Sequence, residues 1–306
     1  MNWIEGIQSA IDYIEAHLCE KIDYGKAAGA ACSSSYHFQR VFGIMCGITL
    51  GEYIRRRRLT LAGKELTEGR KVTEVALKYG YDTPESFSRA FFKFHGMMPS
   101  RVKQGGALNS YSRLRLKIDL IGGTEMKYKL TEMSRRTLVG FKQHFGGVPY
   151  SREGAEQTAR FYMTTRGKQW LLTGASCDHA AEYAVITNMT DEGYDFYIAY
   201  ELDRWTMEHL FDASVTGMPE ISALGLEQLD LPSAVCAVFE TRRCKRPVPE
   251  YEEVARRVIT EWLPSSGYRL ANAPLVTVLH WRPVGEAEKE RYIEICLPVE
   301  KNIGSE

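Results

Sequence analysis

The 306-residue chain lacks the features that mark several classes of protein. Its seven cysteines form no C-x-x-C pair, so neither a zinc site nor a disulfide framework is indicated. No P-loop, G-x-S-x-G or H-E-x-x-H motif occurs and the histidines are scattered, which predicts a protein that is not an enzyme and uses no cofactor or metal. No stretch approaches the roughly 20 apolar residues of a spanning helix, and the acidic amino-terminal segment is unlike a signal peptide. We therefore expect a cytoplasmic protein without membrane contact.

Net charge is also absent, because 39 lysines and arginines balance 39 acidic residues. The balance hides an asymmetry, since residues 1–118 hold 18 basic against 11 acidic residues. Such a segment is typical either of a surface that faces phosphates or of a solvated face. The length and the 44% of apolar residues favour two globular domains.

Apolar residues recur at intervals of three and four through the first hundred residues, which predicts about seven short helices. The longest should run from Thr49 to Glu68 and carry the run Arg55–Arg58. Polar residues suited to capping helix N-termini precede several of these patterns. The predicted N-caps are Asp23, Ser34, Thr49 with Glu52, Thr73, and Thr83 followed by Pro84.

A shift of 49 residues superposes this segment on itself. Ala27, Phe38, Arg40, Phe42 and Gly47 then coincide with Ala76, Phe87, Arg89, Phe91 and Gly96. Each copy predicts a short helix, a tight polar turn and a second helix, which is the helix-turn-helix arrangement.

The second helix of each copy has an apolar stripe and a polar side. The polar side carries arginine and glutamine, which reach base edges in the major groove. For one such helix a solvated face is the alternative, but two copies in one register favour DNA reading. The predicted DNA-contacting residues are Tyr36, Gln39, Arg40, Glu85, Ser88 and Arg89.

Residues 8–104 resemble the double helix-turn-helix DNA-binding domain of the AraC family. The resemblance is carried by YHFQRVF, GITLGEYIRRRRL and VALKYGYDTPESFSRAFFKFHGMMPSRVK. It implies an all-α domain over residues 1–106. It also implies a bacterial nucleoid-associated regulator, an activator rather than a repressor, that has RNA polymerase as a partner. It also implies that the first recognition helix contributes more to base contacts than the second. Two positions depart from the family, Cys32 in the first turn and the acidic Glu85.

Two Gly-Gly pairs and the loss of helical periodicity predict a linker at residues 107–125. Beyond it, strand patterns surround two helical stretches, residues 154–172 and residues 249–263. The order of elements repeats, which predicts an α+β domain of two similar halves over residues 126–302. The fold class is therefore multidomain.

This second domain resembles the GyrI-like effector-binding domain. The resemblance is carried by LDLPSAVCAVFE, YEEVARRVITEWLPSSGYRLANAPLVTVL and YIEICLPVEK. The resemblance implies a small-molecule effector, cationic, flat or hydrophobic, held by Glu294 in a cavity between the halves. Strand alternation by itself also fits an outward, solvated Glu294. The candidate wall residues are Trp205, Tyr251, Trp262, Tyr268, Trp281 and Tyr292.

Two other functions remain open for the second domain. Some GyrI-like domains resemble hydrolases, in which case Glu294 could act with Glu201 or Glu240 as acid or base. Alternatively the domain is a docking module for a protein partner. The expected function is nevertheless a sequence-specific DNA-binding transcriptional regulator that responds to a small ligand.

Overall fold

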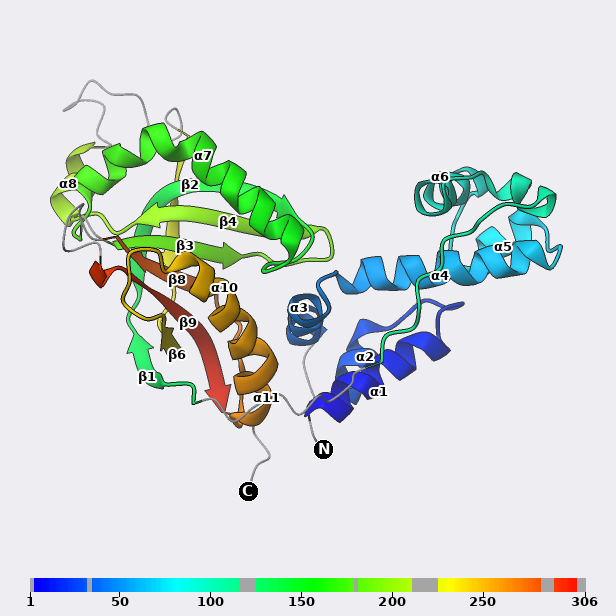
Figure 1. Ribbon diagram of the computed structural model, residues 1–306, viewed down its shortest axis with the longest axis horizontal. Helices are drawn as coiled ribbons and strands as arrows, with labels where there is room; N and C mark the ends of the chain where they lie inside the picture. The colour runs from blue at the N-terminus through cyan, green and yellow to red at the C-terminus, as the bar shows by residue number, and fades with distance from the viewer. Residues whose placement is uncertain are drawn as a thin grey trace. The chain divides into compact units, whose positions relative to one another are not determined.

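The computed structural model describes residues 3–31, 35–115, 125–178, 181–210, 225–281 and 289–301 (Figure 1). The chain divides into two compact units. The helical unit comprises Met1–Phe42 and Ile48–Leu120, and the sheet unit is mainly Ile121–Glu306. The division after Leu120 falls within the predicted linker, whose limits stay a prediction. No helix in the described ranges is long and apolar enough to cross a membrane.

The described part of the helical unit contains six α-helices and a short 3-10 helix, in accord with the expected number. They are α1 (Trp3–Ala16), α2 (Tyr24–Ala30), α3 (Ser35–Cys46), α4 (Leu50–Thr67), α5 (Val72–Lys78), α6 (Pro84–His95) and η1 (Pro99–Gln104). Asp23, Thr49 and Thr83 are N-caps as predicted, because each side chain accepts a hydrogen bond from a backbone N–H two or three residues later. Thr73 is not a cap, since α5 begins one residue earlier, after Lys71.

The duplicated glycines occupy equivalent places at the ends of α3 and α6. Gly47 has φ of 70° and Gly96 has φ of 75°, a left-handed conformation that glycine adopts without steric cost. The apolar stripes of both helices form core, since Phe38, Phe42 and their counterparts Phe87 and Phe91 are fully buried. The internal repeat predicted from the sequence therefore has a direct backbone and packing counterpart.

His95 ends α6 inside the second core and is buried. Its Nε2–H donates to the Leu59 carbonyl oxygen at 3.0 Å, and the ring lies against Gly63, where an added Cβ would come within 3.1 Å of it. Burial lowers the pKa of His95 below its ordinary 6.5, because the imidazolium form is poorly solvated there. The histidine is therefore neutral near pH 7.

Acidification is expected to destabilise the helical unit through His95. Because the folded-state pKa is lowered, the unfolded chain takes up the proton first, so stability falls as the pH drops below 6.5, by up to about 1.4 kcal/mol per pH unit. Urea unfolding of the full chain at pH 7.5 and 5.5 measures this loss. His95→Gln should reduce the difference between the two pH values; an unchanged difference would assign the acid sensitivity to other groups.

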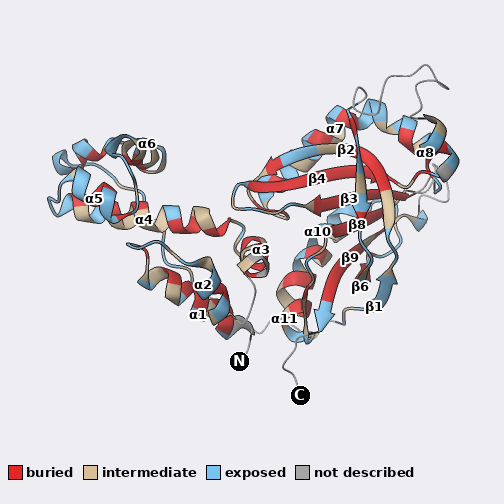
Figure 2. Ribbon diagram, turned by 180° about the vertical axis from the view of Figure 1, so that it is seen from behind, coloured by how far each residue is buried: buried red, intermediate tan, exposed pale blue. Residues whose placement is uncertain are grey.

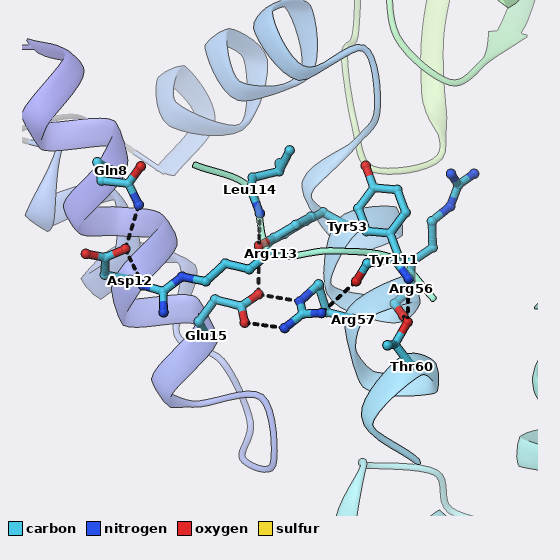
Figure 3. Close-up of polar contacts among 10 residues, drawn as sticks. All are labelled: Gln8, Asp12, Glu15, Tyr53, Arg56, Arg57, Thr60, Tyr111, Arg113 and Leu114. Atoms are coloured by element: carbon cyan, nitrogen blue, oxygen red, sulfur yellow. Dashed lines mark hydrogen bonds and ion pairs between the residues drawn. The ribbon is translucent and has the colours of Figure 1, made fainter. Parts of the chain in front are cut away.

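The first part of the predicted linker lies along α1 and α4 (Figure 3). The Tyr111 N–H donates to Thr60 Oγ1 at 2.9 Å, and the Leu114 N–H donates to the Tyr53 hydroxyl at 3.2 Å. Arg113 pairs with Asp12 at 2.6 Å. Residues 107–115 are thus bound to the helical unit by specific contacts.

The arginine run on α4 is used largely within the helical unit. Arg57 forms two 2.8 Å hydrogen bonds to the Glu15 carboxylate and one of 2.6 Å to the Tyr111 carbonyl oxygen (Figure 3). Arg58 donates to the carbonyl oxygens of Leu18 and Glu20. These two arginines therefore tie α4 to α1 and the following turn.

In the residues that the structure describes, the sheet unit contains nine strands in the order β1-β6-β9-β8-β3-β4-β2-β5, with β7 paired to β9. The strands are β1 (Tyr128–Met133), β2 (Arg136–Gly146), β3 (Ala181–Thr187), β4 (Gly193–Tyr200), β5 (Leu226–Leu231), β6 (Ala234–Glu240), β7 (Tyr268–Leu270), β8 (Leu275–His280) and β9 (Tyr292–Lys301). The described helices of this unit are α7 (Arg152–Ala175), α8 (Arg204–Leu210), α10 (Val248–Arg257), the π-helical turn η3 (Val258–Trp262) and α11 (Leu263–Ser265). Two strands, a helix and two or more strands recur, which confirms the predicted two similar halves.

The two faces of this sheet have different coverings. Helices α7 and α10 lie over one face (Figure 1). The other face carries a buried cluster that includes Leu138, Tyr183, Val238 and Cys296. Strand β4 is accordingly buried along its whole length (Figure 2). The pairing register therefore decides whether a strand side chain faces the helices or the buried cluster on the other side of the sheet.

Candidate functional site

Helix α6 presents a polar face to solvent. Glu85 and Arg89 are exposed and Ser88 is half-buried, while Phe87 and Phe91 are buried on the opposite side. Thr83 Oγ1 accepts the Ser86 N–H, and Pro84 occupies the first turn, so the helix begins directly before this face. The second set of predicted DNA-contacting residues is therefore accessible at a helix N-terminus.

Glu85 and Arg89 stand one turn apart yet form no ion pair with any residue in the described ranges. With Pro84, Ser88, Phe92 and Met98 they line an open hollow of about 460 Å³. Both charged groups are thus available to an external partner.

The first copy differs from the second in exposure, contrary to the symmetry expected from the repeat. Arg40 is only 3% exposed, whereas its counterpart Arg89 is exposed. Gln39 is half-buried and donates to Ser35 Oγ at 3.1 Å. The side chain of Tyr36, like Ser34 and Cys32, lies outside what the structure describes.

Glu294 lies on the sheet face that the helices do not cover. It is paired with Val278, which belongs to the buried cluster of that face, whereas the adjacent Ile295 is paired with Thr277, which contacts Tyr251 of α10. Its carboxylate is 3.0 Å from His280 Nε2 and 3.4 Å from Lys129 Nζ. The His280 hydrogen bond, opposed by burial and assisted by Lys129, lowers the pKa of Glu294. This is opposite to the direction expected for a carboxylate in an apolar cavity, and the charge already has two partners.

The predicted wall residues do not form one aromatic wall. Tyr292 stacks on His280 beside Glu294, at 4.2 Å between ring centroids. Trp262 packs edge-on against Phe239 at 4.9 Å and stacks with Tyr268 at 6.1 Å, while Trp205 is exposed on α8. Tyr251, in contrast, lies against Thr277, and Trp281 lies near a different carboxyl group.

That group is Glu182 on β3, which sequence reasoning missed. It is only 5% exposed, and it lies on the sheet face covered by the helices, because Ala184, two residues later on the same side of the strand, is paired with Thr277, which contacts Tyr251 of α10. The hydroxyls of Tyr162 on α7 and Tyr200 on β4 donate to its two oxygens at 2.7 and 2.8 Å. The Trp281 indole donates a third hydrogen bond. The available signal was an acid within the apolar strand AEYAVIT, on the side shared with Ala184.

The donors around Glu182 are all neutral. In the described part of the chain no lysine, arginine or histidine pairs with it. Burial raises the pKa of Glu182, and the hydrogen bonds from Tyr162, Tyr200 and Trp281 only partly oppose this. Tyr251 on α10 reaches the same face, with its hydroxyl 3.4 Å from Thr277 Oγ1. The site is a buried, uncompensated carboxyl group among aromatic side chains.

The other carboxylates considered for acid or base chemistry are held by cations. Glu201 pairs with Arg136 at 3.2 Å and accepts a hydrogen bond from the Tyr183 hydroxyl. Glu240 lies opposite Glu294 in the strand register, and Lys129 bridges the two carboxylates. Lys129 thus keeps Glu240 and Glu294 together as a structural ion-pair cluster.

Comparison with known proteins finds one match in the helical unit and another in the sheet unit. A helix-turn-helix domain model matches residues 27–105, and a model of the GyrI-like small molecule binding domain matches residues 177–300. The transcriptional activator AarP of Providencia stuartii is 39% identical over 95 residues, which cover 31% of this chain and 70% of AarP. The regulatory protein SoxS of Salmonella typhimurium is 37% identical over 95 residues, covering 31% of this chain and 89% of SoxS.

Among solved structures, that of SAV2435 bound to tetraphenylphosphonium is similar, with 19% identity and a TM-score of 0.42, covering 57% of this chain and 94% of that one. The range matched by the GyrI-like model contains both Glu182 and Glu294. The chain therefore belongs to the AraC-type helix-turn-helix transcriptional regulators and carries a GyrI-like small-molecule-binding domain.

Proposed function

We propose that this regulator is a transcriptional activator that captures a lipophilic cation at Glu182. The observation that carries the proposal is the buried Glu182 carboxyl, which has three neutral donors and no cation among the described residues. A bound cation would supply the missing charge, and the surrounding rings would add cation–π contacts. Ligand capture would then alter how the protein engages DNA or RNA polymerase.

Activation is proposed from the family. AarP is named a transcriptional activator, and this chain covers most of AarP's length. An activator of this family would act in the cytoplasm on the bacterial nucleoid, with RNA polymerase as its partner. Glu294 is not proposed as the ligand carboxylate, because its charge is already satisfied by His280 and Lys129.

Calorimetry on the full-length protein tests ligand capture. Tetraphenylphosphonium serves as the cationic probe, and triphenylphosphine oxide as a neutral aromatic control. We expect the cation to bind and the neutral compound to bind much more weakly. Equal binding of the two compounds would contradict a carboxylate site. Turnover of an ester substrate would favour a hydrolase. If no cationic compound binds, a protein-docking module would be favoured.

Arg89→Ala is expected to weaken binding to a selected duplex by about 1 to 3 kcal/mol without changing the thermal midpoint, because Arg89 is exposed and makes no ion pair in the described ranges. Arg40→Ala is expected to lower the thermal midpoint as well, because Arg40 is buried. Fluorescence anisotropy and thermal unfolding separate the two effects. If Arg89→Ala loses as much affinity on random as on specific DNA, Arg89 contacts only phosphate.

A further inference from the structure

The exposed face of α6 carries an aromatic side chain beside its charged residues. Phe92 is 52% exposed and lines the same hollow as Arg89 and Met98. Phe92 follows Arg89 by three residues, so both side chains lie on one side of the helix. The hollow therefore combines one cation, one carboxylate and an apolar wall.

This composition does not suit a phosphate-binding surface. Arg89 is the single cation among the lining residues, and the carboxylate of Glu85 would be repelled by a phosphate. The side chains of Phe92 and Met98 have no N–H or O–H group that could donate a hydrogen bond to a phosphate oxygen. The face is instead suited to base edges in the major groove, where thymine presents an apolar group, its C5-methyl.

We propose that Phe92 is a specificity-determining residue that contacts a thymine methyl group when α6 enters the major groove. The inference rests on the proposed DNA contact of α6. Three residues advance about 4.5 Å along a helix, and base pairs are spaced about 3.4 Å apart, so the thymine should lie within one or two base pairs of the base reached by Arg89. Met98 would close the hollow over the methyl group.

Replacing thymine by deoxyuridine removes only this methyl group. A duplex selected from a random pool with the full-length protein is footprinted, and each thymine in the half-site that depends on Arg89 is replaced in turn. We expect one replacement to weaken binding by the wild-type protein roughly four-fold, the effect of one buried methyl group. Phe92→Ala should bind the thymine and uracil duplexes equally.

Leu77→Ala is the matched control, because Leu77 is 76% exposed on α5 and does not line the hollow. It should keep the full thymine preference.

The inference is overturned if no thymine shows a Phe92-dependent preference, or if the half-site contains no thymine, while Arg89→Ala still weakens binding. It is also overturned if Phe92→Ala binds both duplexes like the wild type but loses activation with RNA polymerase, since Phe92 would then contact protein. An Arg89→Ala variant with unchanged affinity would instead refute the proposed DNA contact of α6 itself.

Discussion

Arg57→Ala is expected to destabilise the helical unit by about 3 to 5 kcal/mol, the cost of leaving a buried ion without its partner. The side chains of Arg57 and Glu15 are only 11% and 9% exposed, and the guanidinium meets the carboxylate through two hydrogen bonds (Figure 3). Without Arg57, the Tyr53 hydroxyl would be the one remaining hydrogen-bond donor to Glu15 among the described residues. The Tyr111 carbonyl would also lose its hydrogen bond from Arg57, which should loosen residues 107–115.

Hydrogen exchange of the α1 and α4 amides in the full chain measures this loss. Burial raises the pKa of Glu15, but the hydrogen bonds from Arg57 and Tyr53 outweigh it, so the pKa lies below its ordinary 4.5. The stabilisation is therefore present above about pH 4.5 and is lost as the pH falls through the lowered folded-state pKa. Arg55→Ala, on an exposed residue that pairs with Glu52, should cost about 0 to 1 kcal/mol. Equal losses in the two variants would contradict a buried ion pair.

Glu182→Gln is expected to weaken tetraphenylphosphonium binding by about 2 kcal/mol or more, roughly 30-fold, because it removes the buried negative charge while preserving the shape. The tyrosine hydroxyls can rotate to accept from the new amide, so the site should stay packed. Binding of triphenylphosphine oxide should change little. Calorimetry on the wild type and on Glu182→Gln, each with both compounds, gives the four affinities.

The pH dependence provides a second readout for Glu182. Because its folded-state pKa is raised, the carboxyl binds its proton more tightly in the folded protein, so the unliganded protein should lose stability as the pH rises through that pKa. Cation binding should tighten over the same range, because a protonated Glu182 must release its proton to pair with a cation. Both trends should disappear in Glu182→Gln.

Glu294→Gln is the matched control for the ligand site. It also neutralises a partly buried glutamate of the sheet unit, but on the opposite face and beside His280 and Lys129. Cation affinity should be unchanged in this variant. A larger loss with Glu294→Gln than with Glu182→Gln would return the ligand site to the position expected from family resemblance.

Local chemistry explains why much of the fold could be predicted. Thr83 with Pro84 begins α6, and Gly96 ends it, because capping and left-handed backbone depend on residues within a few positions. The repeat at a shift of 49 residues and the buried phenylalanine stripes follow from the same short-range periodicity. The domain types were likewise recognisable from contiguous sequence motifs.

The candidate sites depended on contacts between distant segments. Alternation showed that Glu294 shares a side with Tyr292, but only the pairing of β9 with β8 showed that this is the face away from the helices. Glu182 became a candidate only when Tyr162 and Tyr200 were brought to it from α7 and β4. The sequence by itself therefore determined most of the elements, the caps Asp23, Thr49 and Thr83, and the two domain types, because these depend on neighbours along the chain. Which charges are paired, buried or free was decided by the tertiary structure alone, because desolvation and ion pairing depend on neighbours in space.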